Sequence, residues 1–218
     1  MESIILGLDD IDNVEVEELE TEDVNLIHLG IDCSSSMTGF KSMMNKELEK
    51  FKLEIGGSSA SDQILIARSN FSDDLEIGGY QKVVDLETDY ILGQMTVLYD
   101  TIVNGSTEML KYIDELKSQG MRVNAVFAIF SDGEDTKSKS SISEAKQSIL
   151  ELNKREIITA YMEFGSVAAG MGTKIGFRNV LKTGGSGDEL RQMFGILTTS
   201  VIQHSQLSVP SQDDDFFV

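Results

Sequence analysis

The chain has 218 residues, of which 40% are hydrophobic, and this is enough for one domain with a substantial buried core. Its 37 acidic residues outnumber 18 basic ones, which gives a formal net charge of −19. A surface this negative repels the phosphates of nucleic acid and the headgroups of anionic membranes, so we expect neither as a partner.

The composition also bears on the compartment and on the domain organisation. No apolar run is long enough to span a bilayer, the N-terminus lacks a basic leader, and the single Cys33 excludes an internal disulfide. We therefore expect a cytoplasmic protein. We expect three parts: an acidic lead-in at 1–23, one domain at 24–204, and a flexible acidic tail at 205–218.

Several segments have the composition of strands, because they are short, apolar and bounded by polar turns. In chain order they are 4–8, 25–31, 63–71, 80–86, 122–130 and 157–164. Segments 25–31 and 122–130 are almost continuously apolar, as expected for strands buried on both faces. Segment 80–86 follows a polar turn and predicts an antiparallel strand at the edge of the sheet.

Helical spacing of apolar residues predicts four helices, which alternate with the later strands. They are 40–53, 97–118, 141–154 and 188–204. The third opens with Ser141 and Glu144 in the spacing of a capping box. Strands alternating with helices predict an α/β fold, with a mostly parallel central sheet, one antiparallel edge strand and helices on both faces. In such sheets ligands bind beyond the carboxyl ends of the strands.

Three separated segments carry oxygen-bearing side chains near the ends of predicted strands or helices. Asp32, Ser34 and Ser36 follow the strand at 25–31, Thr96 precedes the helix at 97–118, and Asp132 follows the strand at 122–130 within Ser-Asp-Gly. Each has a simpler interpretation alone, since Asp and Ser often cap helices and Asp-Gly often forms turns. Their occurrence together, in this order, favours a site for a divalent cation.

In these motifs the chain resembles the von Willebrand factor A (vWA) family, over roughly residues 24–204. The resemblance implies a Rossmann-like vWA fold and a complete metal-ion-dependent adhesion site. The metal ligands implied are Asp32, Ser34, Ser36, Thr96 and Asp132. Within this family, the chain is similar to stand-alone intracellular members of bacterial or phage type.

The resemblance also implies a function. Such a site holds Mg²⁺, with Mn²⁺ or Ca²⁺ as alternatives, and the ion binds an Asp or Glu side chain of a partner protein. Stand-alone bacterial members are often adaptors or scaffolds, and we expect a non-enzymatic binding module of this kind. AAA+ ATPases and stress-response proteins are the candidate partners.

Two other functions remain open. A Mg²⁺- or Mn²⁺-dependent hydrolase would need a base near the metal, for which Glu134 and Asp135 are candidates, but Ser34 replaces the second aspartate of an Asp-x-Asp hydrolase motif. A structural assembly component would use the site at a fixed interface. The tail of a second copy could itself supply the acid, through Asp213, Asp214 or Asp215, which would give self-association.

The remaining candidate residues favour structural roles. His28 alternates with apolar residues and is expected in the core, His204 is expected near the C-terminal end of a helix, and Cys33 is expected to be a small buried residue. Two histidines give little support to a zinc site or a Ser-His-Asp triad. Segment 165–172 is rich in glycine but lacks phosphate-loop spacing, so we expect a flexible surface loop.

Overall fold

The computed structural model describes residues 5–6, 13–15, 18–19, 21–164, 170–184, 186–206 and 216–217. Within them, one sheet runs in the order β1-β4-β3-β2-β6-β7-β8, and β5 pairs with β3 beside this path. The strands are β1 (Ile5–Leu6), β2 (Asp23–Asp32), β3 (Ile64–Phe71), β4 (Leu75–Ile77), β5 (Gln81–Lys82), β6 (Arg122–Ser131), β7 (Ile158–Phe164) and β8 (Asn179–Thr183).

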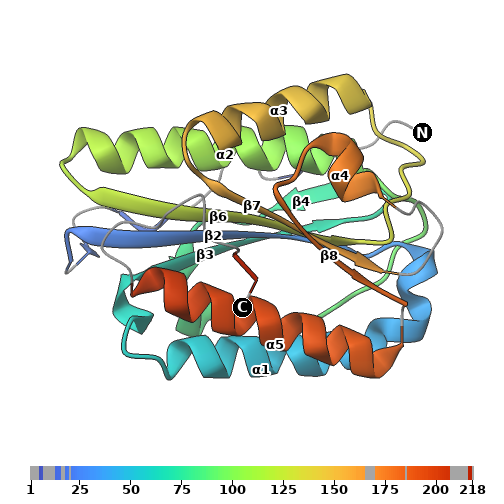
Figure 1. Cartoon of the computed structure of the whole chain (residues 1–218), viewed down its shortest axis with the longest axis horizontal. Coiled ribbons are helices and arrows are strands. Elements are labelled where there is room, and N and C mark those ends of the chain that lie inside the picture. The colour runs from blue at the N-terminus through green and yellow to red at the C-terminus, as the bar shows by residue number, and fades with distance from the viewer. Residues whose placement is uncertain are drawn as a thin grey trace.

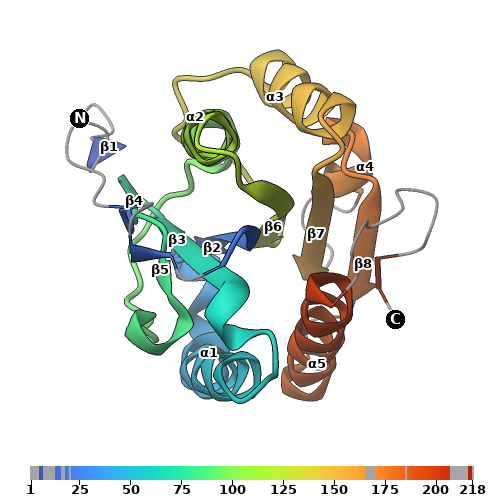
Figure 2. The same cartoon turned by 90° about the vertical axis from the view of Figure 1, so that its left-hand side faces the viewer.

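Helices cover both faces of this sheet (Figure 1). They are α1 (Lys41–Gly56), α2 (Leu98–Ser118), α3 (Ile142–Lys154), α4 (Met171–Ile175) and α5 (Gly187–Ser205), with short 3₁₀ helices at Ser35–Phe40, Ser61–Gln63 and Val83–Asp85. In Figure 2, α1 and α5 lie side by side on one face, and α2 and α3 lie on the other. Each face has its own apolar core. The α/β fold with a mostly parallel sheet is confirmed.

The central strands β3, β2, β6, β7 and β8 are parallel, and their alternate side chains are shared between the two cores. Ile27, Leu29 and Ile31 face the core under α1 and α5, whereas Leu26 and His28 face α2. Gly30 lies below α2, where an added Cβ would lie 2.4 Å from Ile129 Cδ1. The near-continuous apolar run of β2 follows from this burial on both faces.

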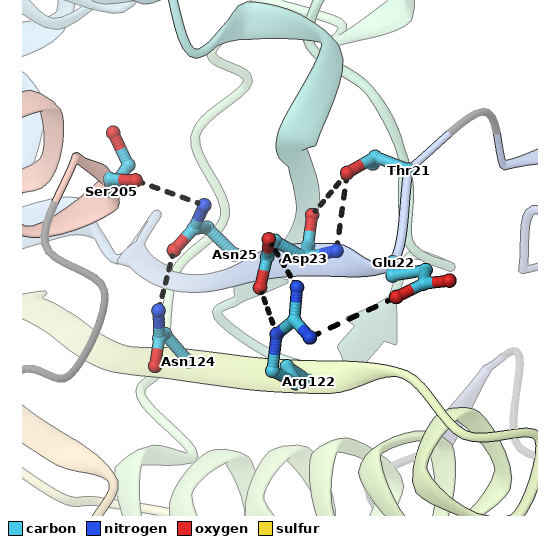
Figure 3. Close-up of polar contacts among 7 residues, drawn as sticks. All are labelled: Thr21, Glu22, Asp23, Asn25, Arg122, Asn124 and Ser205. Carbon is cyan, nitrogen blue, oxygen red and sulfur yellow. Dashed lines mark hydrogen bonds and ion pairs between the residues drawn. The ribbon is translucent and has the colours of Figure 1, made fainter.

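Polar contacts join the starts of β2 and β6 to each other and to the end of α5 (Figure 3). The Arg122 guanidinium donates to both carboxylate oxygens of Asp23, at 2.6 and 2.8 Å. Asn124 donates to Asn25, and Asn25 donates to the carbonyl of Ser205 at the end of α5. The last helix is thereby held at the amino end of the sheet.

The structure differs from the sequence prediction in segment 80–86. Only Gln81 and Lys82 form a strand there, and residues 83–85 form a 3₁₀ helix. The longer antiparallel partner of β3 is β4, at 75–77, which the sequence analysis placed in a turn. The short strand β8 and the helix α4 were also missed. Each has only five residues, so its sequence carries little periodicity.

Parts of both chain ends lie against the domain. In the lead-in, the backbone NH of Val14 donates to the carbonyl of Tyr80, and Tyr112 donates to the carbonyl of Val14. Near the other end, Phe216 is buried, its ring lies 5.1 Å from that of His204, and its NH donates to Asn179. The acidic residues 213–215 and most of 165–172 lie outside the described residues. Among the helices described, none is long and apolar enough to cross a membrane.

Candidate metal centre

Two of the predicted ligands lie at the carboxyl ends of neighbouring strands. Asp32 is the last residue of β2, Asp132 follows the last residue of β6, and Ile31 pairs with Phe130 in the parallel register between them. The strands that precede the two aspartates are thus neighbours in the sheet. Asp32 is fully buried and Asp132 is 6% exposed, so both carboxylates lie at a largely closed edge of the sheet.

The turn after β2 brings two hydroxyls together. The NH of Ser34 donates to Asp32 Oδ1 at 2.9 Å, which bends the chain back over the strand end. The hydroxyl oxygens of Ser34 and Ser36 lie 2.9 Å apart. Ser34 is buried and Ser36 is exposed, so this pair of hydroxyls extends from the protein interior to the surface.

Ser131 connects the two acidic turns. Its hydroxyl donates to Asp32 Oδ2 at 2.7 Å and accepts the NH of Gly133 at 3.0 Å. Gly133 has φ +86°, a conformation that favours glycine, and the NH of Glu134 then donates to Asp132 Oδ1. The sequence analysis quoted Ser131 as part of the motif without giving it a role. It links the turns that carry Asp32 and Asp132.

Thr96 reaches the same edge through the loop that follows Asp132. Its NH donates to the Thr136 hydroxyl at 2.9 Å, and its carbonyl accepts the NH groups of Thr136 and Lys137, both at 3.0 Å. Thr96 is buried. These three bonds hold the segment before α2 against the segment after β6, so all three predicted segments meet at one end of the sheet.

The loop that carries Thr96, residues 86–97, is also bonded to the Asp32 turn. The NH of Gly93 donates to the carbonyl of Cys33 at 2.7 Å, the Ser35 hydroxyl donates to the carbonyl of Gln94 at 3.0 Å, and Tyr90 donates to the carbonyl of Asp32. From beneath, the buried Arg68 donates to the carbonyls of Glu87 and Asp89, at 2.7 and 2.8 Å. The loop is therefore held in place without regular secondary structure.

Two further aspartates anchor the loop between β6 and α3. Asp100, buried in the first turn of α2, accepts the NH groups of Lys139 and Ser140 at 3.0 and 2.8 Å. Asp135 accepts the NH of Tyr99 at 3.2 Å and the Ser138 hydroxyl at 2.6 Å. The sequence analysis missed both roles. An acid in a first helical turn was the available signal at Asp100, but its partners lie about 40 residues away in the chain.

The electrostatics of the edge fit a cation. Burial raises the pKa of Asp32 to about 6, and the nearby Asp132 carboxylate acts in the same direction. Across the described ranges, no Lys or Arg forms an ion pair with either carboxylate. In the same residues, no three His, Cys, Asp or Glu side chains gather as a metal cluster. A cation here would depend on the hydroxyls as well as the two acids, which are ligands suited to Mg²⁺. The assignment of the five ligands stays a prediction.

The other singled-out residues have structural positions. His28 is buried between β2 and α2, bonded to the Ser69 hydroxyl at 2.9 Å and stacked on Phe127. Cys33 is a buried free thiol whose pKa burial raises to about 12, so it is not a thiolate nucleophile. His204 lies in the last turn of α5 against Phe216.

Comparison of the sequence with known proteins finds no matching family model and no matching curated protein. The fold does match solved structures. The pilus adhesin SpaC of Lactobacillus rhamnosus GG aligns with a TM-score of 0.65 and 8% identity, over 84% of this chain and 30% of its own.

Two other matches contain metal. Proximal thread matrix protein 1 of the mussel byssus, with a zinc-occupied MIDAS motif, gives a TM-score of 0.56 and 17% identity over 83% of this chain and 46% of its own. Manganese-loaded TRAP protein of Plasmodium vivax gives a TM-score of 0.53 and 15% identity, over 79% of this chain and 72% of its own. The chain thus spans less than half of the adhesin and of the mussel protein. Strand order, helix placement and these matches together show that the chain has a von Willebrand factor A fold.

Proposed function

We propose that this chain is a metal-dependent protein-binding module, an adaptor or scaffold that holds Mg²⁺ through Asp32, Ser34, Ser36, Thr96 and Asp132. The observation that carries the proposal is the meeting of three distant segments at the carboxyl ends of β2 and β6. The metal-containing matches of the same fold support it.

The charged and the uncharged side chains among the five would have different roles. Asp32 and Asp132 together offset a dication, and the Ser34, Ser36 and Thr96 hydroxyls add donors without adding charge. Bound there, Mg²⁺ would supply an electrophilic position that accepts one carboxylate oxygen from a partner. The exposure of Ser36 leaves this position reachable from the surface. Mn²⁺ and Ca²⁺ also accept oxygen donors. Five donors with one open position suit an octahedral ion such as Mg²⁺ better than Ca²⁺, which usually takes more oxygen ligands.

We propose a non-enzymatic role. Of the two candidate bases, Asp135 already accepts bonds from Tyr99 and Ser138, which position a loop. Glu134, the other candidate, is exposed on the turn that carries Asp132. Phosphatase and esterase assays with Mg²⁺ or Mn²⁺ separate the two classes, since turnover that Asp132→Ala abolishes would replace the binding role with a hydrolytic one.

We further propose that the protein is cytoplasmic, that its partner is an AAA+ ATPase or a stress-response protein, and that it self-associates through its acidic tail. Affinity capture from a cell extract tests the binding role. Native chain and Ser34→Ala are each used with Mg²⁺ and with EDTA. We expect proteins retained only by native chain with Mg²⁺. Equal retention in all four conditions would contradict metal-dependent binding.

A further inference from the structure

The loop that carries Thr96 also presents apolar side chains to solvent. Ile91 is 77% exposed and Met95 is 42% exposed, and Met95 directly precedes Thr96. The Met95 sulfur lies 4.0 Å from the Thr136 hydroxyl, in the loop after Asp132. We call Ile91 and Met95 the apolar rim of the candidate metal centre.

The apolar rim differs from isolated exposed apolar residues, because its loop is fixed. Tyr90, next to Ile91, donates its NH to the Asn45 side chain of α1 and its hydroxyl to the backbone carbonyl of Asp32. Gln94, next to Met95, donates its NH to the Asp73 carboxylate at 2.7 Å. The backbone beside each rim side chain is thus held in place. A partner that contacts the rim meets a loop whose backbone is already ordered.

The surroundings of the rim are acidic. Residues 86–97 carry two exposed carboxylates, Glu87 and Asp89, and no Lys or Arg, and Glu134 is exposed on the turn after β6. On the facing loop, Lys137 is directed to the carbonyl of Asp73. The loop that carries the rim is therefore itself acidic. An approaching acid needs basic residues around it to offset the repulsion.

From these observations we infer the chemistry of the partner. It is a protein segment in which one Asp or Glu has an aliphatic or aromatic neighbour within two positions and Lys or Arg residues flank the pair. The acid binds the cation, the apolar side chain packs on Ile91 and Met95, and the basic residues face the loop carboxylates. This inference rests on the proposed function and specifies the partner of the same site.

The test uses a displayed library of random twelve-residue peptides on the immobilised full chain. Peptides are bound with Mg²⁺ and eluted with EDTA, and the affinity of one enriched peptide is then measured. Ile91→Ser/Met95→Ser removes the rim, and Leu53→Ser/Leu150→Ser is the matched control, because these side chains are 65% and 47% exposed elsewhere, on α1 and α3.

We expect enriched peptides to share the acidic, apolar and basic pattern. The rim variant should weaken binding about tenfold or more, the loss typical of a truncated contact at the centre of an interface, and the control should stay within twofold. Both should bind Mg²⁺ as the native chain does, measured by calorimetry. Acidic peptides without an apolar preference, bound equally by the rim variant, would overturn this inference and leave the proposed function standing. A library that yields no EDTA-eluted peptide would contradict both.

Discussion

The hydroxyl of Ser131 donates to the carboxylate of Asp32 across two neighbouring strands, at 2.7 Å. The same hydroxyl accepts the NH of Gly133, so one side chain sets the spacing between the two acidic turns. The carboxylate it supports is fully buried. This arrangement keeps a charge in place where burial disfavours it.

Asp32→Asn should stabilise the metal-free protein. The folded pKa of Asp32 is raised from 3.8 to about 6, so protonation favours the folded state, and this contribution is lost as the pH rises through about 6. At pH 7 the buried charge costs about 3 kcal/mol. After one weakened hydrogen bond is subtracted, we expect a gain of about 1–2 kcal/mol.

Urea unfolding in EDTA at pH 7 measures this gain. The same titration with Mg²⁺ should stabilise the native chain and leave Asp32→Asn unchanged, since binding to the folded state alone adds stability. A variant that is less stable than the native chain in EDTA would show that Asp32 is not under electrostatic strain.

Ser131→Ala should have the opposite effect on stability. It removes the donor to Asp32 and the acceptor for Gly133, both at buried positions, which costs about 1–3 kcal/mol. Mg²⁺ affinity should fall as well, because the two turns lose their link. Denaturant midpoints and calorimetry measure the two effects, with Ser118→Ala as the control, since Ser118 is exposed at the end of α2. Native affinity in Ser131→Ala would exclude this positioning role.

Arg68→Met should loosen the loop that carries Thr96. The buried guanidinium bonds the carbonyls of Glu87 and Asp89, and no other side chain replaces it in the variant. We expect faster amide hydrogen exchange confined to residues 86–97 and metal affinity reduced about tenfold, a coupling of about 1.4 kcal/mol. Arg122→Met is the control, because Arg122 is exposed at the far end of the sheet. Equal amide exchange of residues 86–97 in the two variants would show that Arg68 does not hold this loop.

His28 should make the protein less stable in mild acid. Burial lowers its folded pKa from 6.5 to about 4, so the unfolded chain binds more protons between these values and stability falls as the pH falls. The full effect is about 3 kcal/mol. His28→Gln lacks this titration, so its stability relative to the native chain should improve steadily from pH 6.5 to 4 in EDTA. A difference that does not change with pH would mean that His28 is charged in the fold.

Phe216→Ala should test whether the end of the chain is part of the domain. Phe216 is buried against His204, and Phe217 beside it is only partly buried. Truncating a buried Phe costs about 3–5 kcal/mol, so Phe216→Ala should lower the unfolding midpoint clearly more than Phe217→Ala does. Equal midpoints would place Phe216 in solvent.

The sequence predicted the parts of the fold that depend on local pattern. The strands around Leu29 and Phe127 were evident from continuous apolar runs, and the capping box at Ser141 and Glu144 is present in the structure. Segment 80–86 was misassigned because two of its apolar residues, Val83 and Leu86, belong to a 3₁₀ helix and its C-cap, from which they reach the core, instead of alternating in a strand.

The sequence likewise predicts only the part of the candidate site that depends on local pattern. The residue types at Asp32, Ser34 and Asp132 follow from a motif beside a strand, which sequence shows. The supporting contacts of Arg68, Asp100 and Tyr90 join residues 19 to 58 positions apart. Such contacts depend on strand order and loop path, which no local pattern encodes.

Calorimetric titration of the full chain with Mg²⁺ tests the central claim most directly. The claim predicts one saturable site per chain in native protein, loss of that site in Ser34→Ala and in Asp132→Ala, and no change in Ser118→Ala. Because the net charge of −19 attracts cations unspecifically, the comparison with the variants decides the result. Equal binding by all four proteins, or none by the native chain, would contradict the metal centre.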